Sequence, residues 1–253
     1  MATHLHRNID CSAAEWEARQ QLAAAYRVFD LLGWSESVYN HISFSVPDEA
    51  GAFLINPYGL LYSEVCASNL VKIDIDGNTL DGSAHPVNKA GFTQHAHFHR
   101  NLPHAKAICH VHTTETMAVS SYEHGLLPIN FYACAFIGRI GYHDFEGITV
   151  RSEEGDRLLA NLGDKSVLML RNHGPVVLGR TIPEMFLQMW SLQRACEIQC
   201  MTLAMGKPVM VADEVIAVHQ RDIHMVQLPS GPGAADFAAW VRKVDREDRS
   251  WRD

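Results

Sequence analysis

The sequence lacks any long apolar run. It contains no stretch of about 18 uninterrupted apolar residues, so we expect no membrane-spanning helix and no membrane partner. The first ten residues, Met1 to Asp10, have no apolar segment of the kind found in signal peptides. Because nothing in the sequence directs export, we expect a cytoplasmic protein, and a composition of 47% hydrophobic and 20% charged residues is ordinary for a globular one.

Basic residues are also in the minority. The chain has 21 lysines and arginines against 29 aspartates and glutamates, which gives a net charge of −8. General nucleic-acid binding depends on a basic surface, so this balance argues against a nucleic-acid partner. A small-molecule substrate is the expected partner instead.

Cysteine pairs of the redox or zinc-binding type are absent. The six cysteines form no Cys-x-x-Cys motif. In a chain without an export signal, we expect buried thiols rather than disulfides. Cys196 and Cys200 are four residues apart on a predicted helix, where core packing is favoured over a soft-metal site.

Hydrophobic periodicity predicts a mixture of helices and strands. Ser12 and Thr181 begin sequences of the capping-box type, and the helices that they open should end at Gly33 and Gly206. We expect an irregular segment at 142–147 and a central, mostly antiparallel sheet flanked by helices. Strands are predicted at 42–46, 52–55, 71–75, 107–110, 166–170 and 176–178, and further helices at 91–100, around 117–119, at 154–162 and at 237–244.

The most informative motif is a pair of histidines at the end of a predicted strand. Alternate side chains of a strand point to the same face, so His110 and His112 should aim the same way. His173 ends another predicted strand in a His-Gly turn. Three imidazoles from two strand ends indicate an open, catalytic transition-metal site more than a closed structural one. The chain has 15 histidines, so a chance pairing stays open on spacing alone.

Several short blocks, taken in order, resemble the class II aldolase/adducin family. They lie at residues 40–43, 54–60, 88–92, 110–113, 142–147 and 170–174, with a further adducin-like match at 197–199. The resemblance runs from about residue 22 to residue 206. We therefore interpret residues 1–253 as a single domain with a tail at 207–253, in the family's three-layer α/β/α fold. The resemblance implies one divalent ion per chain, held by His110, His112 and His173.

The implied metal would act as a Lewis acid toward substrate oxygens and would stabilise the charge left when a carbon–carbon bond breaks. Zinc is the first expectation for three nitrogen ligands, although iron, manganese and cobalt also suit them.

One position departs from the sugar-phosphate aldolases of the family. Their catalytic glutamate lies at the start of the helix before the His-x-His strand, which corresponds to a position at or near Gly91. The segment at 88–92 contains no carboxylate and resembles the adducin-type branch. The phosphate-binding blocks are altered too, since Lys89 and Ala90 stand where the aldolases have two serines. We therefore expect neither a sugar-phosphate aldolase nor an epimerase.

Other polar residues are candidates for acid–base chemistry or substrate binding. Glu115 follows His112 and could orient the metal site, but an acid complementing the dipole of the next helix explains it as well. Lys89 could bind a substrate carboxylate or be a solvated lysine. His95 and His99 share a helix face at a spacing that also resembles His-x-x-x-His zinc motifs. Because the resemblance already supplies three ligands elsewhere, we expect them to be hydrogen-bonded structural residues instead. The predicted set is Glu115, Tyr142 and His143 for catalysis, and Lys89, Asn40 and Gly59 for substrate binding.

Three functions remain open from the sequence. The first is a metal-dependent lyase, a decarboxylase or an aldolase-type enzyme, acting on a small, carboxylated, oxygen-rich substrate. Decarboxylation suits the missing glutamate, because a retro-aldol step needs a base for the departing hydroxyl. The second is an iron-dependent oxygenase, since three histidines leave open positions on the metal. The third is a non-catalytic binding protein like the adducin head, which the retained histidines and the absence of a basic tail make less favoured.

The tail predicts contact with other parts of the protein. Residues 237–244 form a short amphipathic pattern that should dock on the body or on a neighbouring subunit. Trp240, Arg242, Trp251 and Arg252 suit an interface more than a free end. Together with the ring assemblies that the resemblance implies, this composition predicts a homo-oligomer, most simply a tetramer, with sites near the subunit interfaces.

Overall fold

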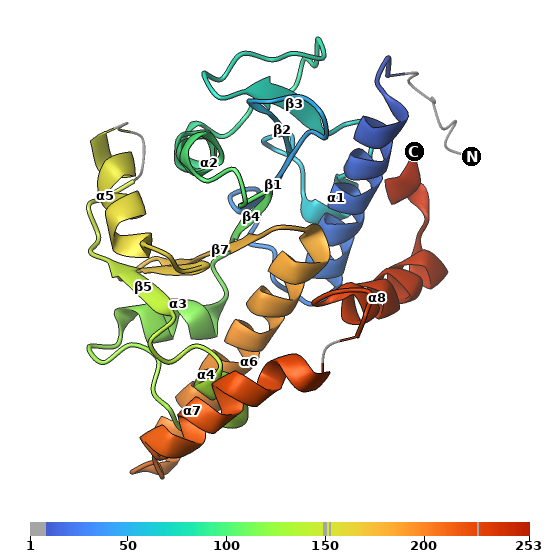
Figure 1. The fold of residues 1–253 in the computed structure, drawn as a ribbon. Coiled ribbons are helices and arrows are strands. Elements are labelled where there is room, and N and C mark those ends of the chain that lie inside the picture. Colours follow the sequence, from blue (N-terminus) through green and yellow to red (C-terminus); the bar gives the residue numbers. More distant parts are fainter. Residues whose placement is uncertain (1–8, 149–150, 152, 227) are drawn as a thin grey trace.

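A seven-stranded sheet forms the centre of the molecule in a computed structural model that describes residues 9–148, 151, 153–226 and 228–253 (Figure 1). The strand order is β3-β2-β1-β4-β7-β6-β5, and every pairing is antiparallel except that of β5 with β6. The predicted mostly antiparallel α/β sheet is therefore confirmed. The strands are β1 (His41–Ser45), β2 (Ala52–Ile55), β3 (Val71–Asp74), β4 (Ala107–His110), β5 (Ile140–His143), β6 (Val167–Leu170) and β7 (Gly174–Gly179).

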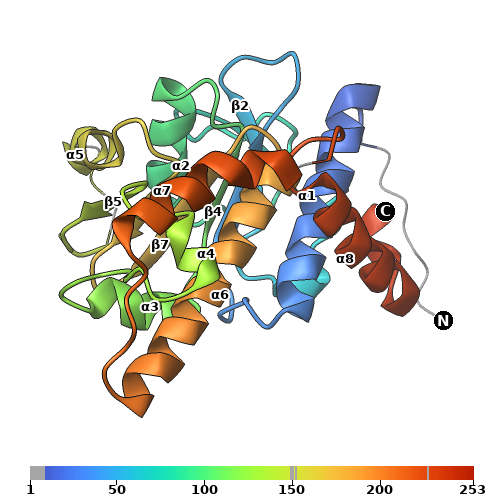
Figure 2. The same cartoon turned by 60° about the horizontal axis from the view of Figure 1, so that its bottom comes forward.

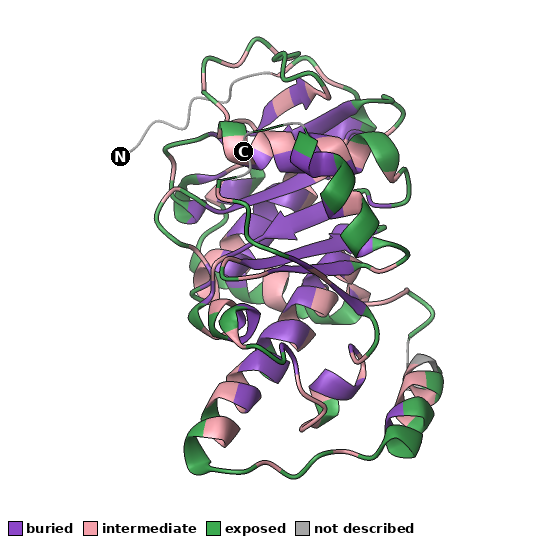
Figure 3. Cartoon of the chain, turned by 90° about the vertical axis from the view of Figure 1, so that its left-hand side faces the viewer, coloured by how far each residue is buried: buried purple, intermediate pink, exposed green. Residues whose placement is uncertain are grey.

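Helices cover both faces of the sheet. On one face lie α1 (Ala13–Leu31), α3 (Thr114–Ser121) and α6 (Ile182–Met205), and on the other lie α2 (Lys89–Asn101) and α5 (Glu153–Leu162). Alternating strand residues feed two cores: Cys109 packs on the α1/α6 side and Ile108 on the α2/α5 side. The strands are buried while the outer helix faces are exposed (Figure 3), as a three-layer α/β/α arrangement requires.

Both predicted helix starts are correct, but neither is a complete capping box. Ser12 Oγ accepts the Glu15 N–H at 3.1 Å, and Thr181 Oγ1 accepts the Glu184 N–H at 3.2 Å. The reciprocal bonds to the capping residues are not made. The Glu15 carboxylate binds Arg19 and Lys72 instead, and that of Glu184 binds Arg180. Ion pairing has taken the place of the second capping bond.

The expectation of irregular structure from residue 142 was wrong for the first two residues of that segment. Tyr142 and His143 complete β5, which pairs in parallel with β6 at the sheet edge. Gly141 interrupts the strand pattern because α5 lies against it, and a Cβ there would come within 2.3 Å of the Asn161 carbonyl oxygen. Two helices were also not predicted, the single turn α4 (Phe131–Cys134) and α7 (Asp213–Asp222).

The tail docks on the body of its own chain. Helix α8 (Ala234–Glu247) packs against α1 and α6, with Phe237 and Val244 buried. Trp251 is buried in the closing 3₁₀ turn Ser250–Arg252, and its carbonyl oxygen accepts the Ala67 N–H at 2.9 Å. Further 3₁₀ turns span Tyr62–Glu64 and Ile223–Val226.

A different part of the C-terminal region carries exposed apolar side chains. Figure 2 shows the end of α6 extending beyond the sheet and α7 lying across α4. Met201, Met205, Val209, Val215 and Val218 are all exposed there. Within the described residues, no helix has both the length and the apolar character needed to cross a membrane. All six cysteines are free thiols, but only Cys109, Cys134 and Cys196 are buried as expected.

Candidate metal centre

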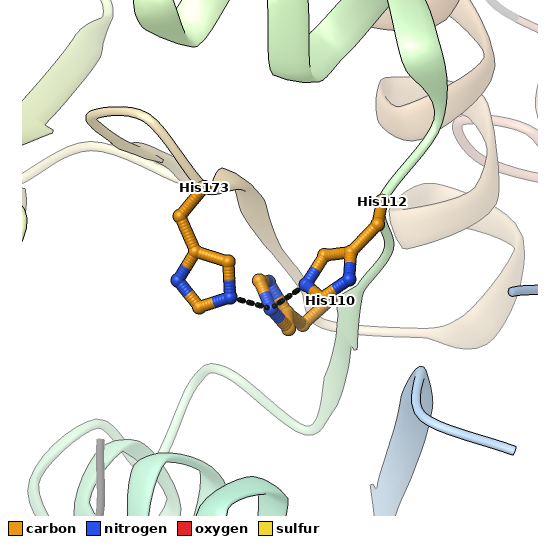
Figure 4. A group of neighbouring side chains, drawn as sticks. All are labelled: His110, His112 and His173. Carbon is orange, nitrogen blue, oxygen red and sulfur yellow. Dashed lines mark hydrogen bonds between the residues drawn. The ribbon is translucent and has the colours of Figure 1, made fainter. Parts of the chain in front are cut away.

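The sheet brings the three predicted ligand histidines together. His110 ends β4, His112 follows two residues later, and His173 lies in the tight turn that joins β6 to β7. Because β4 pairs directly with β7, both segments meet at one end of the sheet. In Figure 4 the three rings converge, with His110 between the other two.

The spacing of the ring nitrogens is suitable for a metal ion. His110 Nε2 lies 2.9 Å from His112 Nε2 and 3.3 Å from His173 Nε2. Two imidazole nitrogens on one tetrahedral zinc ion, each about 2.0–2.1 Å from it, are separated by roughly 3.3 Å. The rings are therefore close to the positions that three ligands of one ion occupy.

The other ring nitrogens settle the tautomers of two of these histidines. His110 Nδ1 is 2.9 Å from the Pro175 carbonyl oxygen, and His112 Nδ1 is 2.5 Å from Glu36 Oε2. Both partners only accept hydrogen bonds, so each Nδ1 carries the hydrogen. In the neutral rings, the two Nε2 lone pairs then face each other, an arrangement that a cation between them stabilises.

A proton is a poor substitute for that cation. Burial, followed by the neighbouring His112 and His173, holds the pKa of His110 well below its ordinary value. Burial also lowers the pKa of His173 to about 4. Neutral imidazoles are the form that binds metals, so the donor set fits a divalent ion near neutral pH.

Glu36 is a candidate site residue that the sequence analysis missed. It lies 76 residues before His112, in the loop after α1, and its half-exposed carboxylate accepts the Nδ1–H of that ring. Such a contact fixes the orientation of a ligand and raises its basicity. No motif surrounds Glu36 in the sequence, so only the fold reveals the contact.

The turn that carries His173 has a demanding backbone. Asn172 has a φ of 58°, in the left-handed region that asparagine tolerates better than most residues. Gly174 has a φ of 155°, and a Cβ there would lie 2.8 Å from the Val111 carbonyl oxygen. The glycine of the His-Gly motif is thus required for the turn to approach the strand that holds the other two ligands.

A cavity of about 450 Å³ lies beside His112. Glu115 lines it from the first turn of α3, and Gln193 Nε2 donates to both Glu115 and Glu197, at 2.9 and 3.0 Å. Of the three predicted catalytic residues, Glu115 is the one that the structure brings to this cavity. Gln193, which sequence reasoning missed, holds it there.

Tyr142 and His143 lie on opposite faces of β5, and neither lines the cavity. Tyr142 Oη accepts the Leu126 N–H at 3.0 Å, and the Arg171 guanidinium lies 4.3 Å from its ring centre. Burial raises the pKa of the Tyr142 hydroxyl. His143 Nδ1 contacts the Asn161 amide at 2.8 Å, on the α5 side. In this structure both side chains tie β5 to its neighbours.

The predicted substrate-binding residues surround the site at different depths. Asn40, just before β1, is buried; its amide donates to the Trp34 carbonyl at 3.2 Å, while its Oδ1 has no hydrogen-bond partner among the described residues. Lys89 is exposed at the first position of α2. Gly59 is exposed in the turn after β2, with a φ of 96°. None of the three has a hydrogen bond to the histidine triad within the described structure.

The space beside Gly91 is filled by another histidine. A Cβ at Gly91 would lie 2.4 Å from Cδ2 and 2.7 Å from Nε2 of His41. A carboxylate side chain at this position would therefore have to displace a buried imidazole. His41 was not among the predicted site residues, although it lies in one of the blocks that carry the resemblance.

Comparisons with known proteins agree with this fold and identify the family. Residues 20–200 match the sequence profile of the family described as class II aldolase and adducin N-terminal domain. The crystal structure of an aldolase II superfamily protein from Pseudomonas syringae is 41% identical, with a TM-score of 0.90 over 96% of this chain and 98% of that one. L-Fuculose 1-phosphate aldolase from Glaciozyma antarctica shares the fold at 24% identity, with a TM-score of 0.81 over 92% and 90% of the two chains. Alpha-adducin from Rattus norvegicus is 50% identical over 189 residues, which cover 74% of this chain and 26% of that protein.

Proposed function

The chain belongs to the class II aldolase and adducin family, and from that membership and its histidine triad we propose that it is a metal-dependent carbon–carbon lyase. The proposed substrate is small, oxygen-rich and carboxylated. The observation that carries the proposal is the convergence of His110, His112 and His173, whose Nε2 atoms meet at 2.9 and 3.3 Å.

Each neighbour of the triad has a definable task in this proposal. The Pro175 carbonyl and the Glu36 carboxylate hold the rings of His110 and His112 in their metal-binding tautomers. A divalent ion held there, zinc in the first instance, supplies Lewis acidity toward substrate oxygens. Glu115 offers a carboxylate from the wall of the adjoining cavity, and the exposed ammonium of Lys89 offers a counter-charge to a substrate carboxylate.

Decarboxylation is the favoured reaction within this class. The first turn of α2 has no acidic residue, and His41 fills the space beside Gly91. A retro-aldol cleavage needs a base to take the proton of the departing hydroxyl, whereas loss of carbon dioxide does not. For the same reason we expect little turnover of phosphorylated sugars.

A binding role without catalysis is the second candidate. It is favoured by the 50% identity with alpha-adducin, although this chain spans only about a quarter of that protein. The retained triad, with the tautomer of two of its rings fixed by acceptors, supports the enzymatic proposal over this one.

The decisive experiment is elemental analysis of the native protein, followed by a screen of carboxylated sugar acids and aromatic acids. We expect one divalent ion per chain and release of carbon dioxide without uptake of oxygen. Substrate-dependent oxygen consumption by an iron-containing protein would favour the oxygenase reading instead. A native protein free of divalent metal would refute the proposal.

We further propose a homotetramer. Since Trp251 and Phe237 are buried within their own chain, the support now comes from the apolar side chains exposed on α6 and α7. Replacing Met205, which is 87% exposed, by aspartate should dissociate the assembly while preserving metal binding. A native protein that sediments as a monomer at micromolar concentration would contradict this. The cytoplasmic location stays a prediction.

A further inference from the structure

A second group of three histidines lies next to the metal site, between β1 and α2. His41 of β1 is the direct partner of His110 across the β1–β4 pairing, and their ring centres are 5.2 Å apart. His95 and His99 face β1 from successive turns of α2. This second group therefore begins at the metal site and continues away from it along β1.

An unbroken series of hydrogen bonds connects these rings. His41 Nδ1 is 2.9 Å from His95 Nε2, and His95 Nδ1 is 2.6 Å from Ser43 Oγ. The same Ser43 hydroxyl is 2.8 Å from His99 Nε2, and His99 Nδ1 is 3.2 Å from Ser45 Oγ. Imidazoles and hydroxyls each donate and accept, so each link can form in either direction.

The spacing of the series follows from the two elements that carry it. Alternate residues of β1 share a face and advance by about 6.6 Å, while one turn of α2 advances by about 5.4 Å. The spacing of His41, Ser43 and Ser45 along the strand is therefore similar to that of His95 and His99, which are four residues apart on the helix. A strand with period two alongside a helix with period near four is what makes the alternation of rings and hydroxyls continuous.

The two ends of the series differ in their access to solvent. His41, Ser43 and His95 are buried, whereas Ser45 and His99 are half-buried at the far end of β1. At the inner end, His41 Nε2 lies beside Gly91 and has no hydrogen-bond partner within the described structure. The series thus connects a free ring nitrogen beside the triad with the protein surface.

The imidazole rings of α2 in this series are also in the neutral form, which can both donate and accept a hydrogen bond. Burial, followed by the charge of neighbouring histidines, holds the pKa of His95 well below its ordinary range. Burial lowers the pKa of His99 to about 3. Both rings are therefore neutral near pH 7, and in neutral rings the two directions of the series differ only in tautomer.

We propose that His41, His95, Ser43, His99 and Ser45 form a proton path, the His41 relay, between the metal site and the surface. The proposal rests on the proposed lyase function, because it gives the site a proton donor where the first turn of α2 has no acidic residue. A decarboxylase needs such a donor, since the carbanion left by loss of carbon dioxide must be protonated.

The transfer balances without any net change of charge in the path. His41 begins with its hydrogen on Nε2 and gives it to the substrate carbanion. His41 Nδ1 then takes the Nε2 hydrogen of His95, and His95 Nδ1 takes the hydroxyl hydrogen of Ser43. Ser43 is restored by the Nε2 hydrogen of His99, which takes the hydroxyl hydrogen of Ser45. Solvent reprotonates Ser45, and every ring ends neutral in the opposite tautomer.

Glutamine at position 99 separates a relay from a purely structural network. A glutamine amide nitrogen can donate to Ser43, but it cannot accept a proton and so cannot pass one on. The matched control is His97→Gln, which makes the same substitution on the same helix at a ring that takes no part in the series.

The test is the exchange of ring N–H hydrogens with solvent, measured by NMR on protein with ¹⁵N-labelled histidine, zinc-loaded and metal-free. In His99→Gln we expect exchange at His41 and His95 to slow by about tenfold or more, because it then depends on local opening of the structure. His97→Gln should exchange like the wild type. If His99→Gln does not fold, Ser43→Ala interrupts the path without removing a ring and should slow exchange at the same two residues.

Unchanged exchange at His41 and His95 in a folded His99→Gln or Ser43→Ala protein would overturn the relay. So would nitrogen chemical shifts that place the hydrogens of two adjacent rings head to head. Metal content is measured on the same samples. If the wild type binds no zinc, but exchange in metal-free His99→Gln is slower than in the metal-free wild type as predicted, the lyase proposal fails while the proton path stands.

Discussion

Two groups of three histidines lie side by side in this molecule, and they differ in what lies between their nitrogens. In the triad, Nδ1 of His110 and of His112 is occupied by an acceptor, so the Nε2 lone pairs face one another. In the His41 relay, each linked ring nitrogen has as its partner either a serine hydroxyl or the nitrogen of the next ring. Burial keeps His110, His173 and all three relay rings neutral.

The comparison shows that burial alone does not assign a role to a histidine. The partner of one ring nitrogen decides what the other can do. When one ring nitrogen donates to a group that can only accept a hydrogen bond, the other nitrogen keeps a lone pair that can bind a metal. When the partner is a hydroxyl, which can donate or accept, either tautomer is possible. Substitutions that change one of these partners should therefore separate the two groups.

The largest effect should come from removing a triad ring. We expect His110→Ala and His173→Ala to lose nearly all bound metal, because two remaining imidazoles hold a divalent ion far more weakly than three. Elemental analysis of dialysed protein measures this, with the exposed His104→Ala as control. One ion per chain in both triad variants would show that the metal is held elsewhere.

A smaller effect should follow from Glu36→Gln, which keeps all three ligands and removes the charge behind His112. Loss of such a contact costs about 10- to 100-fold in metal affinity. A zinc titration against a competing chelator measures it, and the exposed Glu123→Gln serves as control. An affinity equal to the wild type would mean that the tautomer of His112 is fixed without Glu36.

Gly91→Ala tests how closely the His41 ring packs against Gly91 in the first turn of α2. Alanine normally stabilises a helix interior by about 1 kcal/mol relative to glycine. Here its Cβ would lie 2.4 Å from the buried His41 ring, so we expect a net loss of about 1–3 kcal/mol in the free energy of unfolding. Urea unfolding decides the sign, and a variant as stable as the wild type would show that His41 can move aside.

The effect that is smallest at neutral pH is a change in the pH dependence of stability. The pKa of His99 is about 3 in the folded protein and near 6.5 when unfolded, so the unfolded state binds the extra proton between these values. This ring therefore favours the folded state above pH 6.5 and costs stability as the pH falls toward 3.

His99→Gln should accordingly flatten the acid loss of stability by about one proton, or about 1.4 kcal/mol per pH unit below pH 6. Urea unfolding of the variant and the wild type at pH 7, 5.5 and 4.5 gives the two slopes. Equal slopes would mean that His99 takes up its proton without unfolding.

The sequence predicted the parts of the molecule that local pattern controls. Strand β4 and the turn at His173 follow from apolar runs that end in polar residues, so the triad could be predicted before the fold was known. His95 and His99 are hydrogen-bonded, as we expected because the resemblance already supplies three metal ligands elsewhere. Their continuity with Ser43 and Ser45 could not be predicted, because it depends on how α2 lies along β1.

Long-range contacts account for what the sequence did not reveal. Glu36 reaches His112 across 76 residues, and Gln193 reaches Glu115 across 78. Tyr142 and His143 were chosen from a block that resembles the family, but the structure places them on opposite faces of an edge strand. Strand β5 contains Gly141 and is stabilised by its parallel pairing with β6, so its own residues give little indication of a strand in the sequence. The interpretation of residues 1–253 as a single domain stays a prediction.

The position of the triad would make a bound metal a reporter on the assembled sheet. Its ligands come from β4 and from the β6–β7 turn, segments that are joined only after β4 and β7 have paired. An ion that binds this arrangement and not the open chain shifts the folding equilibrium by mass action, by about 2.7 kcal/mol at a free concentration 100 times its dissociation constant. The melting temperature should therefore rise with the logarithm of metal concentration. This rise would report on the pairing of β4 with β7 at the centre of the sheet, without knowledge of any substrate.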